Sequence, residues 1–232
     1  MIRKVPELMM LALALNFGAS ETRAQNYPAK PVRLIVGFSP GGGTDIVARQ
    51  LAQKLSMETG QSFIADNRPG ATGMIAATTV AAAPADGYTL LLAHVNSQAI
   101  APALVPKPPY DPVKDFAPVA YIGYVPNVLV VSNAMPVRTV AELIARANSS
   151  PKGLSYASPG VGSTNHLAGE MLRMESGAKF VHVPYKGSAP AMVDLLGGQI
   201  DMNFDVTASV MQLLKSGRLR ALAVTAQDRD TD

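Results

Sequence analysis

Short apolar runs alternate with helix-like stretches along the first part of the chain. Runs of aliphatic and β-branched residues predict strands, and apolar residues that recur every third or fourth position predict helices. Val47, Leu51 and Leu55, for example, share one helical face. The predicted strands are 32–38, 63–67 and 88–93, and the predicted helices are 44–59 and 73–83. Strands that alternate with helices indicate a parallel sheet flanked by helices, so this part predicts an α/β lobe.

A proline-rich stretch, 102–118, separates this lobe from a second one. It holds six prolines and few periodic positions, so we interpret it as a connector. The strands predicted beyond it are 119–132 (interrupted by Pro126), 154–157, 180–183, 200–204 and 219–225. The helices predicted there are one from a capping box at 139–142 to just before Pro151, then 163–176, 188–196 and 206–214. Two α/β lobes joined by a crossing segment predict a protein with a cleft.

The first 24 residues have the pattern of a secretory signal. Arg3 and Lys4 precede an apolar core, 8–19, and Thr22-Arg23-Ala24 is a small-x-small cleavage site. The core has 12 residues, whereas a bilayer span needs about 20. We therefore expect cleavage near Ala24 and a periplasmic protein. The expected organisation is a signal peptide (1–24), a first lobe (25–102), a second lobe (103–225) and a polar tail (226–232).

Composition excludes several classes of function. The chain has no cysteine, which excludes a disulfide scaffold, a thiolate zinc site and a cysteine nucleophile. Its net charge is +3, and its lysines and arginines are spread along the sequence, so nucleic-acid binding has little support. None of the histidines has a partner at the spacing of a metal site. We expect no metal, no cofactor and no catalytic group.

A glycine-rich loop, Phe38-Ser39-Pro40-Gly41-Gly42-Gly43-Thr44-Asp45, joins the first strand to the first helix. Backbone N–H groups and the positive end of the helix dipole favour an anion there. The loop also contains G-x-S-x-G, the nucleophile elbow of hydrolases. Pro40 follows Ser39, however, and has no N–H to complete an oxyanion hole. A serine hydrolase using Ser39 is therefore the weaker alternative to anion binding.

A second loop of the same design, 158–166, lies between a strand and a helix of the second lobe. Gly160 and Gly162 allow close approach of the backbone, and Ser163 can cap the helix while facing a ligand. One such loop in each lobe can hold a carboxylated ligand from both sides. His166 lies in the first turn of this helix, where we favour a structural role over a functional one. Lys186 is either an anion-attracting group or a solvated surface lysine.

Several motifs, in order, resemble the substrate-binding proteins of tripartite tricarboxylate transporters, the Bug receptors. They are the first loop at 38–45, Asn67-Arg68-Pro69-Gly70-Ala71-Thr72-Gly73, Ala85-Asp86-Gly87-Tyr88-Thr89-Leu90, Tyr110-Asp111-Pro112-Val113-Lys114-Asp115-Phe116, the second loop at 158–167, Val181-His182-Val183-Pro184-Tyr185-Lys186-Gly187, and Asp194-Leu195-Leu196-Gly197-Gly198-Gln199-Ile200-Asp201. The resemblance implies a type II periplasmic-binding-protein-like fold of two lobes, each a mostly parallel sheet flanked by helices.

The resemblance further implies a monomeric receptor that delivers a small carboxylate to a membrane permease. The two loops then hold one carboxylate, partly through ordered water, with Tyr185, Lys186, Gly187 and Asp205 at the border. The predicted ligand-binding residues are Phe38, Ser39, Gly42, Gly43, Thr44, Asp45, Gly73, Ser158, Gly160, Gly162, Ser163, His166, Tyr185, Lys186, Gly187 and Asp205. Citrate, an amino acid, an aromatic acid and a nicotinate-like compound all remain open as ligands.

Two further expectations follow from this resemblance. The receptor either feeds a permease or presents its ligand to a membrane kinase, and the residues do not separate these roles. Family members also continue beyond the strand at 219–225, through a part that completes the first lobe. We therefore expect a truncated chain with an incomplete first lobe, less stable than a full receptor.

Overall fold

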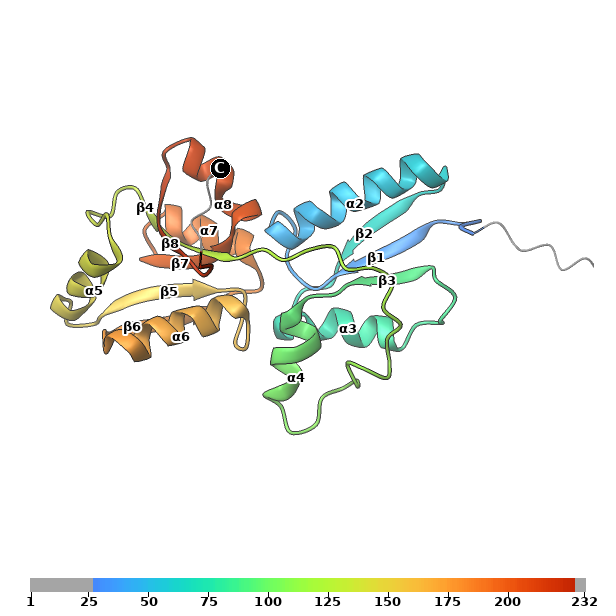
Figure 1. Cartoon of the computed structure of the whole chain (residues 1–232), viewed down its shortest axis with the longest axis horizontal. Coiled ribbons are helices and arrows are strands. Elements are labelled where there is room, and N and C mark those ends of the chain that lie inside the picture. Colours follow the sequence, from blue (N-terminus) through green and yellow to red (C-terminus); the bar gives the residue numbers. More distant parts are fainter. Residues whose placement is uncertain (1–26, 228–232) are drawn as a thin grey trace, which may run out of the picture.

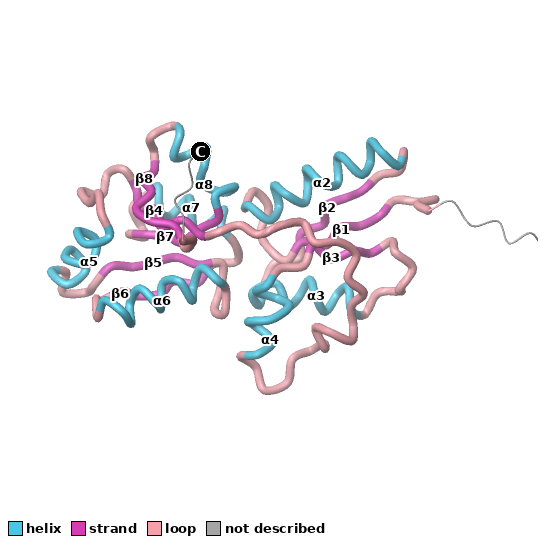
Figure 2. The backbone as a smooth tube through the Cα atoms, viewed as in Figure 1, coloured by secondary structure: helices cyan, strands magenta, loops and turns pink. Residues whose placement is uncertain are grey.

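The computed structural model describes residues 27–227 and contains two sheets, each flanked by helices (Figure 1). The signal peptide predicted at 1–24 lies outside the described residues. The first sheet falls within 32–92 and the second within 127–224. Among the described residues, the chain passes from one sheet to the other through a long segment without strands. Figure 2 shows this segment in pink, apart from one helical stretch in cyan.

The first sheet is parallel, in the order β2-β1-β3. Its elements are β1 (Val32–Val36), α2 (Gly43–Thr59), β2 (Phe63–Asn67), η1 (Ala71–Gly73), α3 (Met74–Ala81) and β3 (Thr89–Leu92). The central strand β1 carries the most buried side chains, because α2 covers one face of the sheet and α3 the other (Figure 1). The core on the α2 side is small and consists of Leu34, Val36, Ala48 and Leu92, with partly buried neighbours.

The second sheet has five strands, in the order β6-β5-β7-β4-β8. Its strands are β4 (Asn127–Ser132), β5 (Leu154–Ser158), β6 (Phe180–Pro184), β7 (Met202–Val206) and β8 (Leu219–Val224). Its helices are α5 (Val140–Ser149), α6 (Thr164–Ser176), α7 (Ser188–Leu196) and α8 (Thr207–Lys215). Strand β4 is antiparallel to both of its neighbours, whereas β5 is parallel to β6 and β7. The two-lobed, mostly parallel α/β fold is confirmed.

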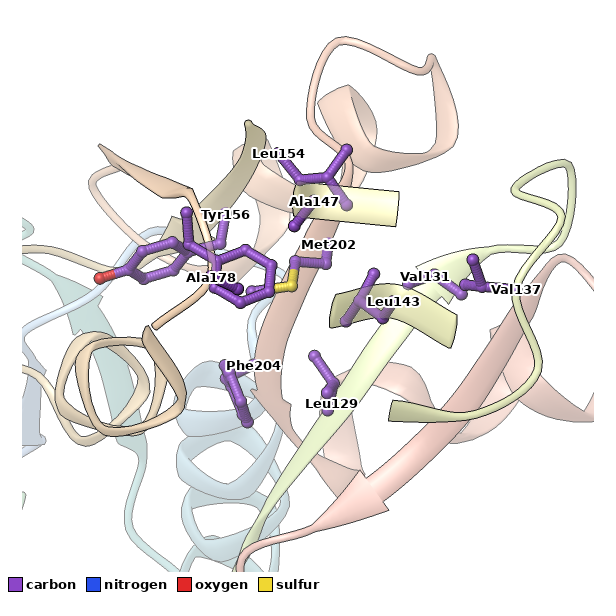
Figure 3. Packing of buried hydrophobic residues seen from close by; sticks show 11 residues of the cluster. Leu129, Val131, Val137, Leu143, Ala147, Leu154, Tyr156, Ala178, Met202 and Phe204 are labelled. Carbon is purple, nitrogen blue, oxygen red and sulfur yellow. The ribbon is translucent and has the colours of Figure 1, made fainter. Parts of the chain in front are cut away.

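Strand β4 shows why this sheet is apolar on both faces. Leu129 and Val131 contribute to one core, shown in Figure 3, which also contains Tyr156 and Phe204. Val128 and Val130 point the other way, into the core that α7 and α8 cover. Alternate side chains of a strand point to opposite faces, so a run of apolar residues fits a sheet that helices cover on both sides.

Two expectations about local structure were wrong. The strand predicted at 119–132 begins only at Asn127, because residues 117–126 pair with no strand among the described residues. Val119, Tyr121 and Tyr124 of this segment are exposed. The other error lies within the proline-rich connector and just before it. A helical stretch formed by η2 (Asn96–Ile100) and α4 (Ala101–Ala103) was missed. The predicted connector starts at Pro102, but a proline is tolerated in the first turn of a helix.

None of the helices within residues 27–227 combines the length and apolarity of a membrane span.

Candidate functional site

The first loop is held in shape by the buried side chain of Asp45, in the first turn of α2. One of its oxygens accepts hydrogen bonds from the Gly41 amide (2.9 Å) and Arg49 Nε (2.8 Å), and the other accepts one from Asn67 Nδ2 (2.9 Å). Asp45 is only 3% exposed. Burial opposes its ionisation, but the bonds from Arg49, Gly41 and Asn67 outweigh burial and lower the pKa of the carboxyl. Asp45 therefore holds the first loop in shape through its buried side chain.

The second loop is braced in the same way, by two buried serines. Ser163 is the N-cap of α6: its Oγ accepts from the His166 amide (3.1 Å) and donates to the Gly160 carbonyl (2.7 Å). Ser158 Oγ accepts from the Gly160 amide at 3.1 Å. His166 Nδ1 in turn accepts from the Gly162 amide (3.3 Å). The capping role predicted for Ser163 is confirmed, and its hydroxyl is fully used within the loop.

The first loop contacts the second lobe through direct hydrogen bonds. The amide and the Oγ of Ser39 both donate to the Lys186 carbonyl, at 3.2 and 2.9 Å. The Gly43 amide donates to Ser209 Oγ of α8 at 2.8 Å. Glycine is required at 187, where φ is +154° and an added Cβ would lie 2.9 Å from the Ser39 nitrogen. The lobes are therefore in contact where the first loop meets the 185–187 turn and the start of α8.

Two more contacts between the lobes come from residues that sequence reasoning missed. Thr72 Oγ1 donates to the Val161 carbonyl at 2.6 Å. The Thr164 amide, at the start of α6, donates to the side-chain oxygen of Asn96 at 3.0 Å. Thr72 and its neighbour Ala71 have positive φ values of 55° and 47°, a strained conformation for residues with a Cβ. Such strain is characteristic of binding sites and switch segments.

A small cavity of about 20 Å³ lies where the loops face each other. Its walls come from both lobes: Phe38, Gly42, Gly43, Thr44, His94, Asn96, Pro159, Asn165, Ser188, Asp205 and Val206. This volume has room for about one water-sized group. The amide of Thr44, in the first turn of the 17-residue helix α2, has no acceptor among the described residues. A free helix N-terminal amide beside a cavity is suited to an anion.

Asp205 is the one carboxylate in the wall of the small cavity, and it is almost fully buried. Its oxygens accept from Ser188 Oγ (2.8 Å), the Val206 amide (2.8 Å) and Asn203 Nδ2 (3.1 Å). Burial raises the pKa of Asp205 to about 6, although these hydrogen bonds work in the opposite direction. The raised pKa makes it easier for Asp205 to take up a proton when an anion binds nearby, and that proton would remove the repulsion between the two groups.

A larger cavity, of about 380 Å³, adjoins the second loop. Its lining residues are Gly70, Ala71, Thr72, Met74, Ala101, Leu104, Val105, Pro159, Gly160, Val161, Tyr185 and Lys186. Pro159 lines both cavities, so the two cavities are neighbours. The walls of the larger cavity again come from both lobes.

A group of aromatic and titratable side chains supports the second loop from within the second lobe. Ser158 Oγ lies 2.6 Å from His182 Nε2, and the rings of His182 and His166 are 4.2 Å apart. Tyr156 stacks on His182 and donates to Glu170 at 2.7 Å. Burial lowers the pKa of His182 to about 4, and His166 adds to the effect. His182 is therefore neutral at physiological pH.

No catalytic arrangement emerges from these contacts. Ser39 Oγ is bonded to the Lys186 carbonyl, so the hydrolase alternative loses its nucleophile. Ser158 has a histidine partner, but it is fully buried and also bonded to Gly160. Within residues 27–227, no group of three or more acidic or histidine side chains is placed to hold a metal. The contacts of the described residues therefore give the hydrolase alternative no support.

The structure divides the predicted site residues into two groups. Those that line a cavity are Phe38, Gly42, Gly43, Thr44, Asp205, Gly160, Tyr185 and Lys186. Those that shape or support the loops are Ser39, Asp45, Gly73, Ser158, Gly162, Ser163, His166 and Gly187. The cavity-lining residues that sequence reasoning missed include Thr72, His94, Asn96, Asn165 and Ser188. Of these, Thr72 and Asn165 lie in motifs that the sequence had marked, the glycine-rich stretch 67–73 and the second loop at 158–166.

Comparisons with known proteins agree with this architecture. The protein BugT of Bordetella pertussis is 40% identical over 214 residues, which are 92% of this chain and 66% of BugT. The chain thus spans about two thirds of that relative. An R. palustris protein solved with adipate is 42% identical with a TM-score of 0.84, over 88% of this chain and 68% of that one. MatC from Rhodopseudomonas palustris, solved with bound malate, is 33% identical with a TM-score of 0.81, over 88% and 69%.

A family model decides the classification. Residues 47–232 match the model described as the tripartite tricarboxylate transporter family receptor. That match covers most of the chain, including the second loop and the greater part of both sheets. The chain therefore belongs to the receptor family of the tripartite tricarboxylate transporters.

Proposed function

We propose that this protein is a periplasmic receptor that binds a small carboxylate between its two lobes and delivers it to the permease of a tripartite transporter. The observation that carries the proposal is the meeting of two helix N-termini at one cavity. Helices α2 and α6 both begin there, one from each lobe. Each N-terminus favours a negative charge by about 0.3–1 kcal/mol, and by up to about 2 kcal/mol when partly buried.

Closure of the lobes adds to the binding energy. The contacts of Ser39 with Lys186, and of Thr164 with Asn96, form only when the lobes come together. A ligand that touches both lobes stabilises this closed arrangement, because it makes its full set of contacts in no other. Backbone donors, dipole ends and closure can together supply the roughly −8 kcal/mol of micromolar affinity.

The named relatives support the carboxylate class. Adipate and malate, found in two solved relatives, are both small dicarboxylates. Their proteins share the two-lobed fold over 88% of this chain. We extend the carboxylate class, and not either compound, to this protein.

Calorimetric titration with a charge-matched pair of variants tests the proposal. Asn96→Asp keeps the oxygen that accepts from Thr164 but adds a negative charge to the cavity wall. Asn148→Asp makes the same change on the exposed face of α5. We expect a dicarboxylate such as adipate to bind the wild type and Asn148→Asp alike, and Asn96→Asp at least tenfold more weakly. If none of a panel of carboxylates bound to the wild type, the proposal would be refuted.

Delivery to the permease needs a separate experiment in cells. Uptake of a labelled ligand identified by the titration should cease when the receptor gene is deleted and return with the wild-type gene. The Asn96→Asp gene should restore less uptake at low ligand concentration. Uptake that is independent of the gene would leave binding intact but contradict the transport role.

A further inference from the structure

His166 holds the second loop with an unprotonated ring nitrogen. Its Nδ1 accepts a hydrogen bond from the Gly162 amide at 3.3 Å. A backbone amide can only donate, so this bond needs the lone pair of Nδ1, and the neutral ring carries its proton on Nε2. A second proton, on Nδ1, would set two N–H groups against each other and break the bond. The observed shape of the loop therefore belongs to neutral His166.

The surroundings of the His166 ring also oppose a positive charge. The ring lies in the first turn of α6, at the positive end of the helix dipole, and its centre is 4.2 Å from that of the His182 ring. Burial lowers the pKa of His166, although the Glu170 carboxylate one turn along the helix works in the opposite direction. That carboxylate is already shared between Arg173, at 2.7 Å, and the Tyr156 hydroxyl, also at 2.7 Å. In this arrangement a proton on His166 is disfavoured.

The other elements near His166 leave this balance unchanged. Strand β4 packs against α6, and η2 and α4 approach the second loop from the first lobe, but none of the three contains a titratable residue. Asp205 of β7 is bonded to Ser188 of α7, and α7 covers the opposite face of the sheet from α6. His94 precedes η2 and has its ring against Phe38. The groups that face His166 are therefore those of β5, β6 and α6 named above.

Contacts with the first lobe lock the loop on both sides of Gly162. The Val161 carbonyl accepts from Thr72 at 2.6 Å, and the Thr164 amide donates to Asn96 at 3.0 Å. Gly162 lies between these contacts, with a φ of +79°. When the lobes separate, both contacts are lost, and a glycine has the freedom to turn its amide away from His166. Closure of the lobes and protonation of this ring are therefore in competition.

We propose that His166 is a positioning residue that holds the second loop for ligand binding only while it is neutral, so that its protonation in acid favours the open lobes and releases the ligand. This inference rests on the proposed function and adds its regulation by pH. The open protein takes up the proton more readily than the closed complex, so ligand affinity falls as the pH drops through the pKa of His166 in the open protein.

Calorimetry with adipate as the probe separates the proton from the support. In His166→Asn, the side-chain oxygen takes the place of Nδ1 and accepts from the Gly162 amide, but it does not titrate. At pH 7.5 this variant should bind adipate more tightly than His166→Ala, which has no acceptor. Between pH 7.5 and pH 5.5, the ratio of wild-type affinity to His166→Asn affinity should fall about three- to tenfold. The ratio cancels the titration of adipate and of Asp205, because both titrate with either protein.

His182→Gln is the matched control. Its side-chain amide can hold Ser158 in place of Nε2, which lies 2.6 Å from Ser158 Oγ. Burial lowers the pKa of His182 to about 4, below the tested range, so the ratio of wild-type affinity to His182→Gln affinity should not change with pH. A change with pH in this ratio, without one in the ratio for His166→Asn, would overturn the assignment to His166.

Histidine NMR of the wild type gives a second readout that depends on no variant. The chain has three histidines, so each ring can be assigned and titrated separately. The pKa of His166 should be lower in the adipate complex than in the free protein. Equal pKa values in the two states, or a constant affinity ratio for His166→Asn, would overturn the inference while the proposed function stood. Failure of every carboxylate to bind at any pH would overturn both.

Discussion

The lobes approach each other closely at Gly160, and this contact gives a test of how they fit together. Gly160 has a φ of +134°, and a Cβ added to it would lie 2.7 Å from Thr72 Oγ1 in the other lobe. The Cβ of Thr72 itself would be 3.7 Å away, an ordinary contact. Gly160→Ala therefore introduces two separate costs, backbone strain within the second loop and a clash with a single oxygen atom across the cleft.

The two costs can be separated by a double-mutant cycle. Strain at this φ costs about 1–3 kcal/mol for a residue with a Cβ. Thr72→Ala removes the clashing oxygen, at the cost of its hydrogen bond to Val161, worth about 0.5–1.5 kcal/mol. Combined with Gly160→Ala, it should therefore relieve the clash. We expect the double variant to lose less free energy of unfolding than the two single variants lose together, with a coupling energy of about 1 kcal/mol or more.

Ligand affinity and urea unfolding together make the assay. Gly177→Ala is the matched control, because Gly177 also has a positive φ (+63°) but nothing within 4 Å of an added Cβ. It should lower the free energy of unfolding by about 1–2 kcal/mol and leave affinity unchanged. Gly160→Ala should lower affinity at least tenfold, and Thr72→Ala should recover part of that loss. Strictly additive effects, or an unchanged affinity in Gly160→Ala, would refute the described contact between the lobes.

Three further variants test the supports of the site. Asp45→Ala removes the acceptor that holds Gly41, Arg49 and Asn67, so it should weaken ligand binding at least fivefold in calorimetry; unchanged affinity would contradict its bracing role. Gly169→Ala places a Cβ 2.2 Å from the Tyr156 ring and should lower the melting temperature by several degrees, whereas Gly217→Ala, with open space around it, should lower it less. For His182, the folded-state pKa of about 4 lies below the ordinary 6.5, so the unfolded chain binds more protons between these values and stability rises with pH. The melting-temperature advantage of wild type over His182→Gln should therefore grow from pH 4.5 to 6.5, and a constant or shrinking difference would contradict a buried neutral imidazole.

Much of the fold follows from local patterns in the sequence. The helix predicted at 188–196 has those bounds in the structure. Half of the predicted capping box forms: Thr139 Oγ1 accepts from the Glu142 amide at 3.1 Å, whereas the Glu142 carboxylate accepts from the Arg138 amide at 2.6 Å and not from the Thr139 amide. These elements are set by residues a few positions apart. The antiparallel direction of β4 could not be predicted in this way, because a run of apolar residues looks the same for a strand in either orientation. The prediction of a strand at 119–126 was wrong for a related reason, since apolar residues form a strand only where a partner strand is available.

The site divides in the same way. Both glycine-rich loops were recognisable, because glycines between a strand and a helix are a local signal. Thr72 and Asn96 were not, because their partners Val161 and Thr164 are 89 and 68 residues away in the chain. Ser163 was recognised as a helix cap and Asp45 as a member of the site, but only the structure shows that the Asp45 side chain holds the first loop in shape. Residue type and spacing thus predicted which loops line the cavities between the lobes, and tertiary contacts decide which atoms face those cavities.

The central claim is that one carboxylate is held between the start of α2 and the second loop. A crystal structure of the protein with adipate tests it most directly. We predict a carboxylate group within hydrogen-bond distance of the Thr44 amide, in the cavity that Phe38, Pro159 and Asn165 line from opposite lobes. A carboxylate bound to one lobe alone, or outside this cavity, would contradict the account.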